Sequence, residues 1–260
     1  MKLRTVLIAV FTIGILAIPP AYAGTRASPV SYKTHDGREM RGFIMQKEDV
    51  ADDAPVAFLL HGMKAHMFHW IADGFPMYGG SLSDMLVEKG YRVIALDARI
   101  HGYTRKEGNP ERALTKASLG MTSDYYSMIK DTVKDYEFIL KDRLPKNFKN
   151  TRHVLVVGYS MGAQMGIMLA AENPEVTHLV TLVPPHTGRH KSVSPEEHAP
   201  KVKAKWLLIT ASDDEYASAK ENDALEAAIT TDYERFEFES EHVLPPEYVA
   251  KVEEWVSKIE

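Results

Sequence analysis

The sequence predicts an α/β fold built on a doubly wound, mostly parallel β-sheet. Short apolar runs alternate along the chain with segments that show the 3.6-residue apolar period of a helix. Most of these runs lack polar alternation, which is typical of strands that are covered on both faces. Regular alternation of strands and helices favours right-handed crossovers, and such crossovers join parallel strands.

The composition is that of a globular protein. Of 260 residues, 45% are hydrophobic and 26% are charged, the formal net charge is −5, and there is no cysteine. Disulfide frameworks, thiolate metal sites and cysteine nucleophiles are therefore excluded. Mild acidity argues against a nucleic-acid partner, which requires clustered Lys and Arg. We expect residues 24–260 to form a single domain.

Residues 1–23 have the pattern of a secretory signal peptide. Lys2 and Arg4 precede the apolar run Val6–Ile18, and the segment ends on Ala21-Tyr22-Ala23. The alternative is an uncleaved anchor, but this run of 13 residues is too short for a hydrocarbon core of about 30 Å. We expect cleavage after Ala23, a periplasmic or secreted protein, and no stable membrane insertion afterwards.

The first two strands are expected to form an antiparallel hairpin, because Val30–His35 and Arg41–Gln46 flank the turn signal Asp36-Gly37. The later strands are expected to be parallel. They are Pro55–Leu60, Tyr91–Asp97, His153–Gly158, Thr177–Val183, Lys205–Ala211 and Arg235–Phe238.

Five segments between and after these strands have helical signals. They are Leu82–Lys89, Asp124–Leu144, Met165–Ala171, Ala217–Ile229 and Pro245–Ile259. The second is the longest, and we expect it to end before Pro145. Its apolar stripe includes Tyr126 and Tyr136, which we interpret as core residues without a chemical role.

The strongest motif is Gly158-Tyr159-Ser160-Met161-Gly162, which follows a predicted strand and begins a helix of small and apolar residues. In this context Gly-x-Ser-x-Gly is typical of a nucleophile elbow, in which serine occupies a strained turn. Side chains two residues before and after the serine would collide with the neighbouring strand and helix. The alternative interpretation is a tight turn with an inert serine.

Two further motifs extend this pattern. His61-Gly62-Met63 follows an apolar strand, and Asp97-Ala98-Arg99-Ile100-His101-Gly102 follows the next one. With the elbow, they make nearly the whole mature chain resemble the α/β-hydrolase family, although Ile100 replaces a glycine of the family pattern. The resemblance implies an α/β-hydrolase fold with an N-terminal antiparallel hairpin. The strand preceding Pro184 and the strand beginning near Lys205 are connected by too few residues for more than a minimal cap.

The same resemblance implies the order nucleophile, acid, base along the chain. A serine nucleophile needs a histidine to take its proton. The histidines that follow Ser160 are His186, His190, His198 and His242. Only His242 lies between the last predicted strand and the terminal helix, where the family places its base, so we predict His242.

The acid is expected after the strand that ends in Ala211, where Asp213, Asp214 and Glu215 are consecutive. The family pattern favours Asp214. Asp213 is the alternative, with capping of the following helix as its other possible role. The other acid position of the family, after Thr177–Val183, holds Pro184-Pro185 and has no carboxylate.

The backbone N–H of Met161 is expected to donate to the developing oxyanion, since it follows the nucleophile at a helix N-terminus. By resemblance, Met63 supplies the second N–H. Aromatic and apolar residues near Met63 are candidates for a substrate pocket, with core packing as the alternative. They are Phe68, Trp70, Phe75, Met77 and Tyr78.

A catalytic metal is not expected. His61, His66 and His69 are close in sequence, but no carboxylate with matching spacing joins them, and His61 already belongs to the His-Gly motif. The sequence thus predicts a secreted serine hydrolase that cleaves small-molecule carboxylic esters, or related acyl bonds, without a cofactor. The alternatives are a peptidase or amidase of the same fold, or a non-catalytic binding protein. The acyl group and the oligomeric state are left open.

Overall fold

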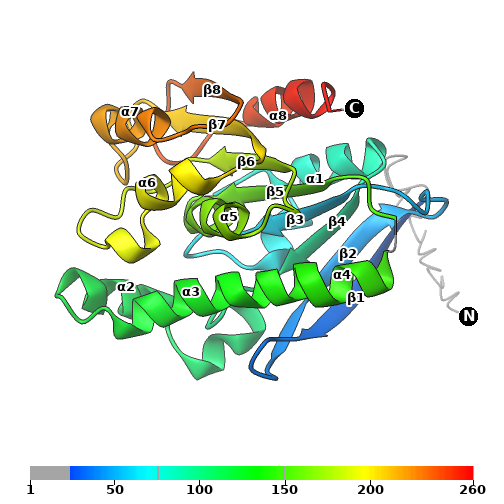
Figure 1. The fold of residues 1–260 in the computed structure, drawn as a ribbon, viewed down its shortest axis with the longest axis horizontal. Helices are drawn as coiled ribbons and strands as arrows, with labels where there is room; N and C mark the ends of the chain where they lie inside the picture. Colours follow the sequence, from blue (N-terminus) through cyan, green and yellow to red (C-terminus); the bar gives the residue numbers. More distant parts are fainter. Residues whose placement is uncertain (1–23, 75, 149, 260) are drawn as a thin grey trace, which may run out of the picture.

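The computed structural model describes residues 24–74, 76–148 and 150–259. Within them the chain forms an eight-stranded sheet of order β1-β2-β4-β3-β5-β6-β7-β8 (Figure 1). The strands are β1 Thr25–Lys33, β2 Glu39–Lys47, β3 Val56–Leu60, β4 Arg92–Leu96, β5 Val154–Tyr159, β6 His178–Leu182, β7 Lys205–Ala211 and β8 Tyr233–Phe238. The predicted doubly wound, mostly parallel sheet is confirmed.

Strand direction brings the functional segments to one edge of the sheet. β1 pairs antiparallel with β2 from Thr25 opposite Lys47 to Lys33 opposite Glu39, and β2 pairs antiparallel with β4. All later pairs are parallel. The carboxyl ends of β3 to β8 therefore share one edge, where ligands of such sheets bind.

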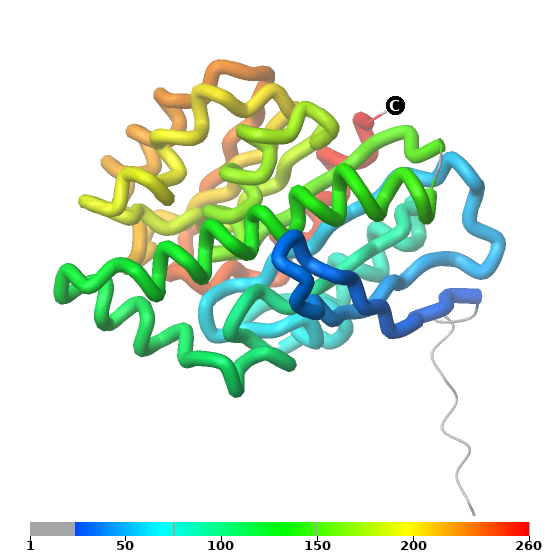
Figure 2. Tube along the Cα trace, turned by 60° about the horizontal axis from the view of Figure 1, so that its bottom comes forward, coloured from blue at the N-terminus to red at the C-terminus, as the bar shows by residue number. Residues whose placement is uncertain are grey.

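Helices cover both faces of the sheet (Figures 1 and 2). Their bounds are α1 Gly79–Glu88, α2 Pro110–Ser118, α3 Ser123–Phe138, α4 Leu144–Asn147, α5 Met161–Glu172, α6 Pro195–His198, α7 Ala219–Ala227 and α8 Tyr248–Val256. One core cluster joins α2, α3, α5 and α7 to the sheet, and the other joins α1 and α8 to it. Every residue of β3, β4, β5 and β6 is buried, as expected for strands covered on both faces.

One helix prediction requires correction, and one helix was not predicted. The expected end before Pro145 is wrong: α3 passes at Phe138 into a π-helical segment, Ile139–Arg143, and then into α4. Pro145 directly follows this π-helical segment, and prolines and π-bulges are usual sites of irregularity within a longer helix. Helix α2 was not predicted, although Asn109 before Pro110 is a helix-start signal and its side chain accepts the Arg112 N–H at 2.7 Å.

Some predictions fall on residues that the structure does not describe. The expected signal peptide, residues 1–23, and the pocket candidate Phe75 lie outside the described residues. Among those described, no helix is both long and apolar enough to cross a membrane.

Candidate active site

Ser160 lies between β5 and α5 in a strained backbone conformation. Its φ is 54° and its ψ is −117°, which few residues other than glycine adopt. The flanking glycines permit this turn, because a Cβ on Gly158 would lie 2.2 Å from the Gly162 carbonyl oxygen, and a Cβ on Gly162 would lie 1.9 Å from the Leu60 carbonyl oxygen. Ser160 thus occupies a sharp turn between the end of β5 and the start of α5.

The structure brings the three predicted side chains together in one hydrogen-bonded chain. The Ser160 Oγ lies 2.8 Å from His242 Nε2. On the other side of the ring, His242 Nδ1 lies 2.9 Å from Asp214 Oδ1 and 3.0 Å from Oδ2. The Asp214 side chain is 1% exposed and that of His242 is 13% exposed. A carboxylate on Nδ1 keeps the proton there, which leaves Nε2 free to accept the serine hydroxyl proton.

Asp213 lies outside this chain. Its side chain is exposed and accepts the Ser212 hydroxyl at 3.0 Å. Nor does it cap the next helix, because Ser218 is the N-cap of α7 and forms a capping box with Glu221.

The three other histidines considered as bases contact other partners. His186 Nδ1 is 2.6 Å from Glu196, and His190 Nδ1 is 3.2 Å from the Tyr126 hydroxyl. His198 Nε2 is 3.4 Å from the Ser192 carbonyl.

The loop that carries Met63 lies against the serine. A Cβ on Gly62 would be 3.4 Å from the Ser160 Cβ and 4.0 Å from its Oγ. Met161 is the first residue of α5, and first-turn N–H groups have no partner within a helix. The two predicted donors therefore come from the loop beside Ser160 and from the helix that follows it.

Two buried histidines form hydrogen bonds with the main chain of this loop and of the loop after β4. His61 accepts the Ala98 N–H on Nε2 at 3.0 Å and lies 2.9 Å from the Gly62 carbonyl through Nδ1. His101 Nε2 lies 2.8 Å from the Met63 carbonyl. Burial lowers the pKa of both imidazoles, well below the usual value for His61. A neutral ring protonated on Nδ1 fits the bonds of His61, so neither of its nitrogens is available to a metal ion.

The departure from the family pattern at Ile100 leaves the backbone in the conformation that glycine favours. Ile100 has a φ of 57°, in the left-handed region, although it is β-branched. Its side chain packs against the core cluster of α2, α3 and α5.

The pocket candidates divide by exposure. Trp70 is fully buried in the cluster of α1 and α8 and therefore cannot line an accessible pocket, which corrects that expectation. Met77 is likewise buried in this cluster, and Tyr78 is partly buried against it. Phe68 is 55% exposed and remains available to a ligand.

Sequence reasoning missed two tyrosines beside His242. The Tyr216 ring lies 4.6 Å from the His242 ring, and the Tyr216 N–H donates to Asp214 Oδ1 at 2.8 Å. The Tyr159 ring is also close to the His242 ring, with ring centroids 6.1 Å apart. Tyr159 occupies a variable position of the elbow motif, and Tyr216 follows the acid by two residues, so only their positions relative to these motifs could have singled them out.

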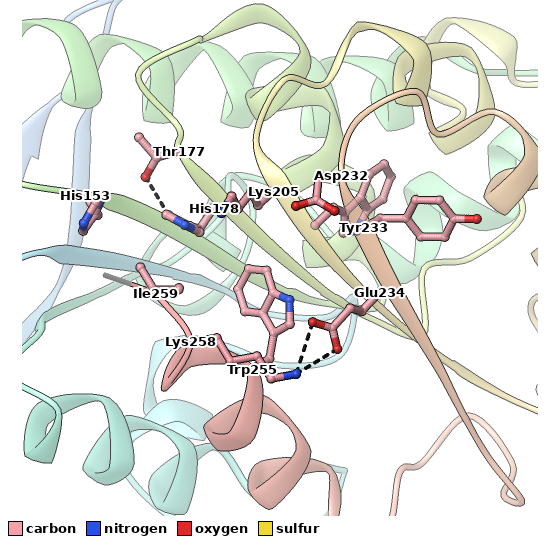
Figure 3. A pocket seen from close by; sticks show the side chains of 11 residues that line it. His153, Thr177, His178, Lys205, Asp232, Tyr233, Glu234, Trp255, Lys258 and Ile259 are labelled. Atoms are coloured by element: carbon pink, nitrogen blue, oxygen red, sulfur yellow. Dashed lines mark hydrogen bonds and ion pairs between the residues drawn. The ribbon is translucent and has the colours of Figure 1, made fainter.

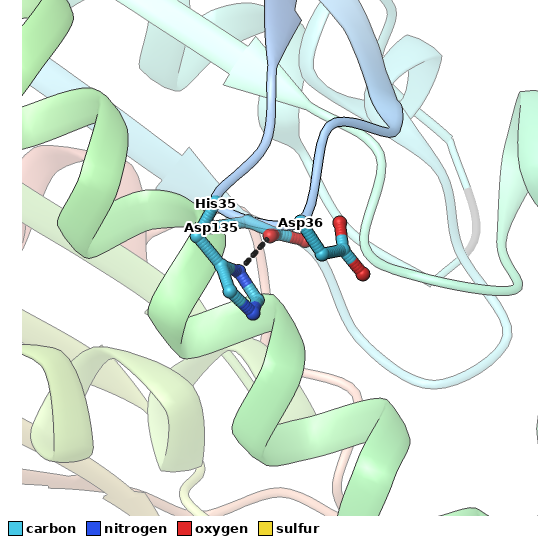
Figure 4. Close-up of side chains that lie close together, drawn as sticks. All are labelled: His35, Asp36 and Asp135. Carbon is cyan, nitrogen blue, oxygen red and sulfur yellow. Dashed lines mark hydrogen bonds and ion pairs between the residues drawn. The ribbon is translucent and has the colours of Figure 1, made fainter.

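Outside this site, the described residues include one group of side chains of the types that can bind a metal ion. Ligand atoms of His35, Asp36 and Asp135 lie within 4.8 Å of one another (Figure 4). Arg99 already neutralises these carboxylates, since its guanidinium donates to Asp135 at 2.7 Å and lies 3.0 Å from Asp36. The group is therefore an ion-pair network that ties the β1–β2 turn to α3.

A cavity of about 500 Å³ lies beside the amino ends of β5 to β8, at the edge of the sheet opposite to the edge that carries Ser160 (Figure 3). The Thr177 hydroxyl is 2.8 Å from His178 Nδ1 in its wall, and Lys258 pairs with Glu234 at 3.2 Å. Ser160 follows the carboxyl end of β5, so this cavity is separate from the serine site.

Comparisons with known proteins agree with the observed fold. A sequence model of the alpha/beta hydrolase fold matches residues 58–214. A cold-adapted esterase from an Arctic intertidal metagenomic library is 18% identical over 90% of this chain and 94% of its own, with a TM-score of 0.71. For an esterase of Pyrococcus furiosus the identity is 18%, the coverage 97% of each chain and the TM-score 0.69.

A putative dienelactone hydrolase of Klebsiella pneumoniae is 14% identical over 90% of this chain and 96% of its own, with a TM-score of 0.66. In sequence, an uncharacterized protein of Rickettsia prowazekii (strain Madrid E) is 25% identical over 139 residues, which are 54% of this chain and 49% of that protein. The chain thus spans about half the length of the curated relative it matches.

Proposed function

The chain belongs to the α/β-hydrolase family, and we propose that it is a serine hydrolase that cleaves small carboxylic esters with Ser160, His242 and Asp214. The observation that carries this proposal is the continuous hydrogen-bonded chain from Asp214 through His242 to a serine in a strained turn. A structural serine would not require this backbone strain, which costs about 1–3 kcal/mol.

The reaction begins when Ser160 Oγ attacks the ester carbonyl carbon while His242 Nε2 takes the hydroxyl proton. Asp214 stabilises the resulting imidazolium through Nδ1. Negative charge develops on the former carbonyl oxygen, and the N–H groups of Met63 and Met161 are placed to donate to it. The tetrahedral intermediate collapses when the C–O bond to the alcohol breaks and Nε2–H protonates the departing oxygen. An acyl group then remains on Ser160.

Deacylation repeats these steps with water. His242 Nε2 removes a proton from the water molecule as its oxygen attacks the acyl carbon. The second intermediate releases the carboxylic acid when Ser160 Oγ leaves and regains the proton from Nε2. Each proton taken by His242 is returned within the same half-reaction, so the cycle needs neither a cofactor nor a co-reactant besides water.

We test the proposal with p-nitrophenyl esters of increasing chain length and with a fluorophosphonate probe, using Ser160→Ala as the matched control. We expect hydrolysis of the esters, and labelling of the wild type that maps to Ser160. Absence of labelling would reject the serine nucleophile and favour a binding protein. Cleavage of aminoacyl amides in preference to esters would assign a peptidase instead.

We also propose that the protein is exported through residues 1–23 and acts in the periplasm or outside the cell, because of the basic start, apolar run and Ala-Tyr-Ala ending. Amino-terminal sequencing of the native protein from the extracytoplasmic fraction tests this. We expect Gly24 as the first residue, whereas an intact Met1 would contradict export by cleavage.

A further inference from the structure

Tyr159 is a buried tyrosine directly before the serine of the elbow. Its side chain is 2% exposed, and its ring packs at 83° to the ring of His242 and at 64° to that of Tyr248. A buried hydroxyl therefore needs hydrogen-bond partners of its own.

Both partners lie in the loop that carries the base. The Tyr159 hydroxyl donates to the His242 carbonyl at 2.9 Å and accepts the Leu244 N–H at 3.1 Å. Leu244 is 1% exposed, so its N–H cannot turn to solvent for a replacement. The Tyr159 hydroxyl oxygen thus holds the main chain at two points, His242 and Leu244.

Among the described residues, few other hydrogen bonds hold the main chain of this part of the loop. Residues 239–247, between β8 and α8, form neither strand nor helix. Within the described chain, the His242 N–H has only a long contact, 3.4 Å, to the exposed Glu215 carboxylate. The Tyr159 hydroxyl therefore makes the shorter and more buried attachment of the His242 main chain.

The attachment also couples the base to the nucleophile. Tyr159 is the last residue of β5 and is covalently bonded to Ser160. The Tyr159 hydroxyl therefore fixes His242 relative to the same strand end that presents the Ser160 Oγ. Burial raises the pKa of Tyr159 to about 12, so the hydroxyl keeps its proton and continues to donate at neutral and mildly alkaline pH.

We propose that Tyr159 is a positioning residue, whose hydroxyl sets the distance between His242 Nε2 and Ser160 Oγ by fixing the His242–Leu244 loop. This inference rests on the proposed function. Tyr159 touches no reacting atom in this role. Its loss should therefore reduce kcat and leave KM nearly unchanged, because ground-state binding does not depend on the His242 contact.

The test is Tyr159→Phe, which keeps the ring and removes only the hydroxyl. Displacement of a catalytic group by about 1 Å costs roughly 100-fold in rate; we expect kcat for p-nitrophenyl acetate to fall by about 10- to 100-fold, with KM within about threefold of wild type. The matched control is Tyr136→Phe. That tyrosine is also buried and donates to a main-chain carbonyl, of Leu96 at 3.1 Å, without contacting His242.

A second readout does not depend on turnover. The His242 Nδ1 proton that bridges to Asp214 should give a low-field proton NMR signal in the wild type and in Tyr136→Phe, and should broaden or vanish in Tyr159→Phe. A merely structural role for Tyr159 would lower the melting temperature without affecting this signal or the kcat of the folded protein.

A kcat within about twofold of wild type together with an intact His242 signal in Tyr159→Phe would overturn the inference. If the wild type itself hydrolyses no ester, the proposed function fails, and the NMR signal still decides the positioning role. If Tyr159→Phe does not fold, amide exchange in the wild type decides it. We then expect the Leu244 N–H to be protected, and rapid exchange would overturn the inference.

Discussion

The Asp214 carboxylate faces the His242 imidazole with both oxygens, at 2.9 and 3.0 Å from Nδ1. The preceding Asp213 is exposed and bonds only to the neighbouring Ser212 hydroxyl among its side-chain contacts in the described chain. Both residues follow β7, which ends at Ala211, and the loop there brings only the Asp214 carboxylate to His242.

We therefore predict that Asp214→Asn lowers kcat by about 10⁴-fold, because the amide holds the wrong imidazole tautomer and cannot stabilise the imidazolium. Asp213→Asn should stay within a few-fold of wild type. Steady-state kinetics on one ester compares the two variants. If Asp213→Asn had the larger effect, the acid would have to be reassigned.

Ser160→Ala should abolish ester hydrolysis, with a loss of on the order of 10⁴-fold or more in kcat. The melting temperature should fall little, because the change removes one partly exposed hydroxyl. Turnover and thermal unfolding of the same preparation measure both quantities. Near wild-type turnover would end the serine-nucleophile proposal.

Gly162→Ala should destabilise the fold, because the new Cβ would lie 1.9 Å from the Leu60 carbonyl oxygen and 2.9 Å from that of His61. Both contacts are backbone atoms that cannot rotate away, so we expect a cost of about 2–3 kcal/mol in the free energy of unfolding. Denaturant unfolding measures it.

Gly166→Ala is the control on the same helix. Its Cβ would meet the Val156 side chain at 3.2 Å, and alanine gains about 1 kcal/mol in helix propensity over glycine. We expect this variant to be as stable as wild type within about 1 kcal/mol. Equal stability of both variants would contradict this prediction and show that the backbone around Gly162 can shift to accommodate a Cβ.

Stability should decrease between pH 6.5 and about 4, partly because of His178. Burial, with the nearby His153 and Lys205, lowers its pKa from 6.5 to about 4 in the folded protein. Above pH 6.5 the imidazole is neutral in both states and its contribution to stability is fully present. As the pH falls towards 4, the unfolded chain takes up a proton that the folded protein does not, so the contribution is lost.

The variant His178→Phe keeps a ring against Trp255 but cannot titrate. We expect its free energy of unfolding, from urea denaturation, to change less between pH 7 and 4.5 than that of wild type, by on the order of 1 kcal/mol. His61 also has a lowered pKa and persists in both proteins, so a residual pH dependence is expected. Identical pH dependence in the two proteins would assign the effect to other groups.

The site should prefer short or medium acyl esters in solution. The connection from β6 to β7 contains α6, of four residues, and two short 3₁₀ turns, Lys191–Val193 and Ala199–Lys201. Such a segment cannot form a lid with a core of its own. A sharp rise in rate above the solubility limit of the substrate, or a preference for long-chain triacylglycerols, would contradict this prediction.

Local patterns in the sequence predicted most of the sheet, because strands buried on both faces are continuous apolar runs. The bounds expected for β3 to β7 lie within one or two residues of those observed. The pattern fails where helices are mostly polar or interrupted. α2 is mostly polar and buries only Pro110, Ala113 and Ala117, and helical structure continues beyond Pro145 through a π-helical turn.

The amino-acid sequence was sufficient to predict the fold class and the position of the elbow, because both depend on neighbouring residues: apolar runs make buried strands, and glycines permit the turn at Ser160. It left Asp213 and Asp214 open, and it missed Tyr159 and Tyr216. Those decisions needed the tertiary structure, since Ser160 and His242 are 82 residues apart. Which carboxylate or hydroxyl reaches His242 depends on the direction of each side chain at the sheet edge and on the packing of distant loops.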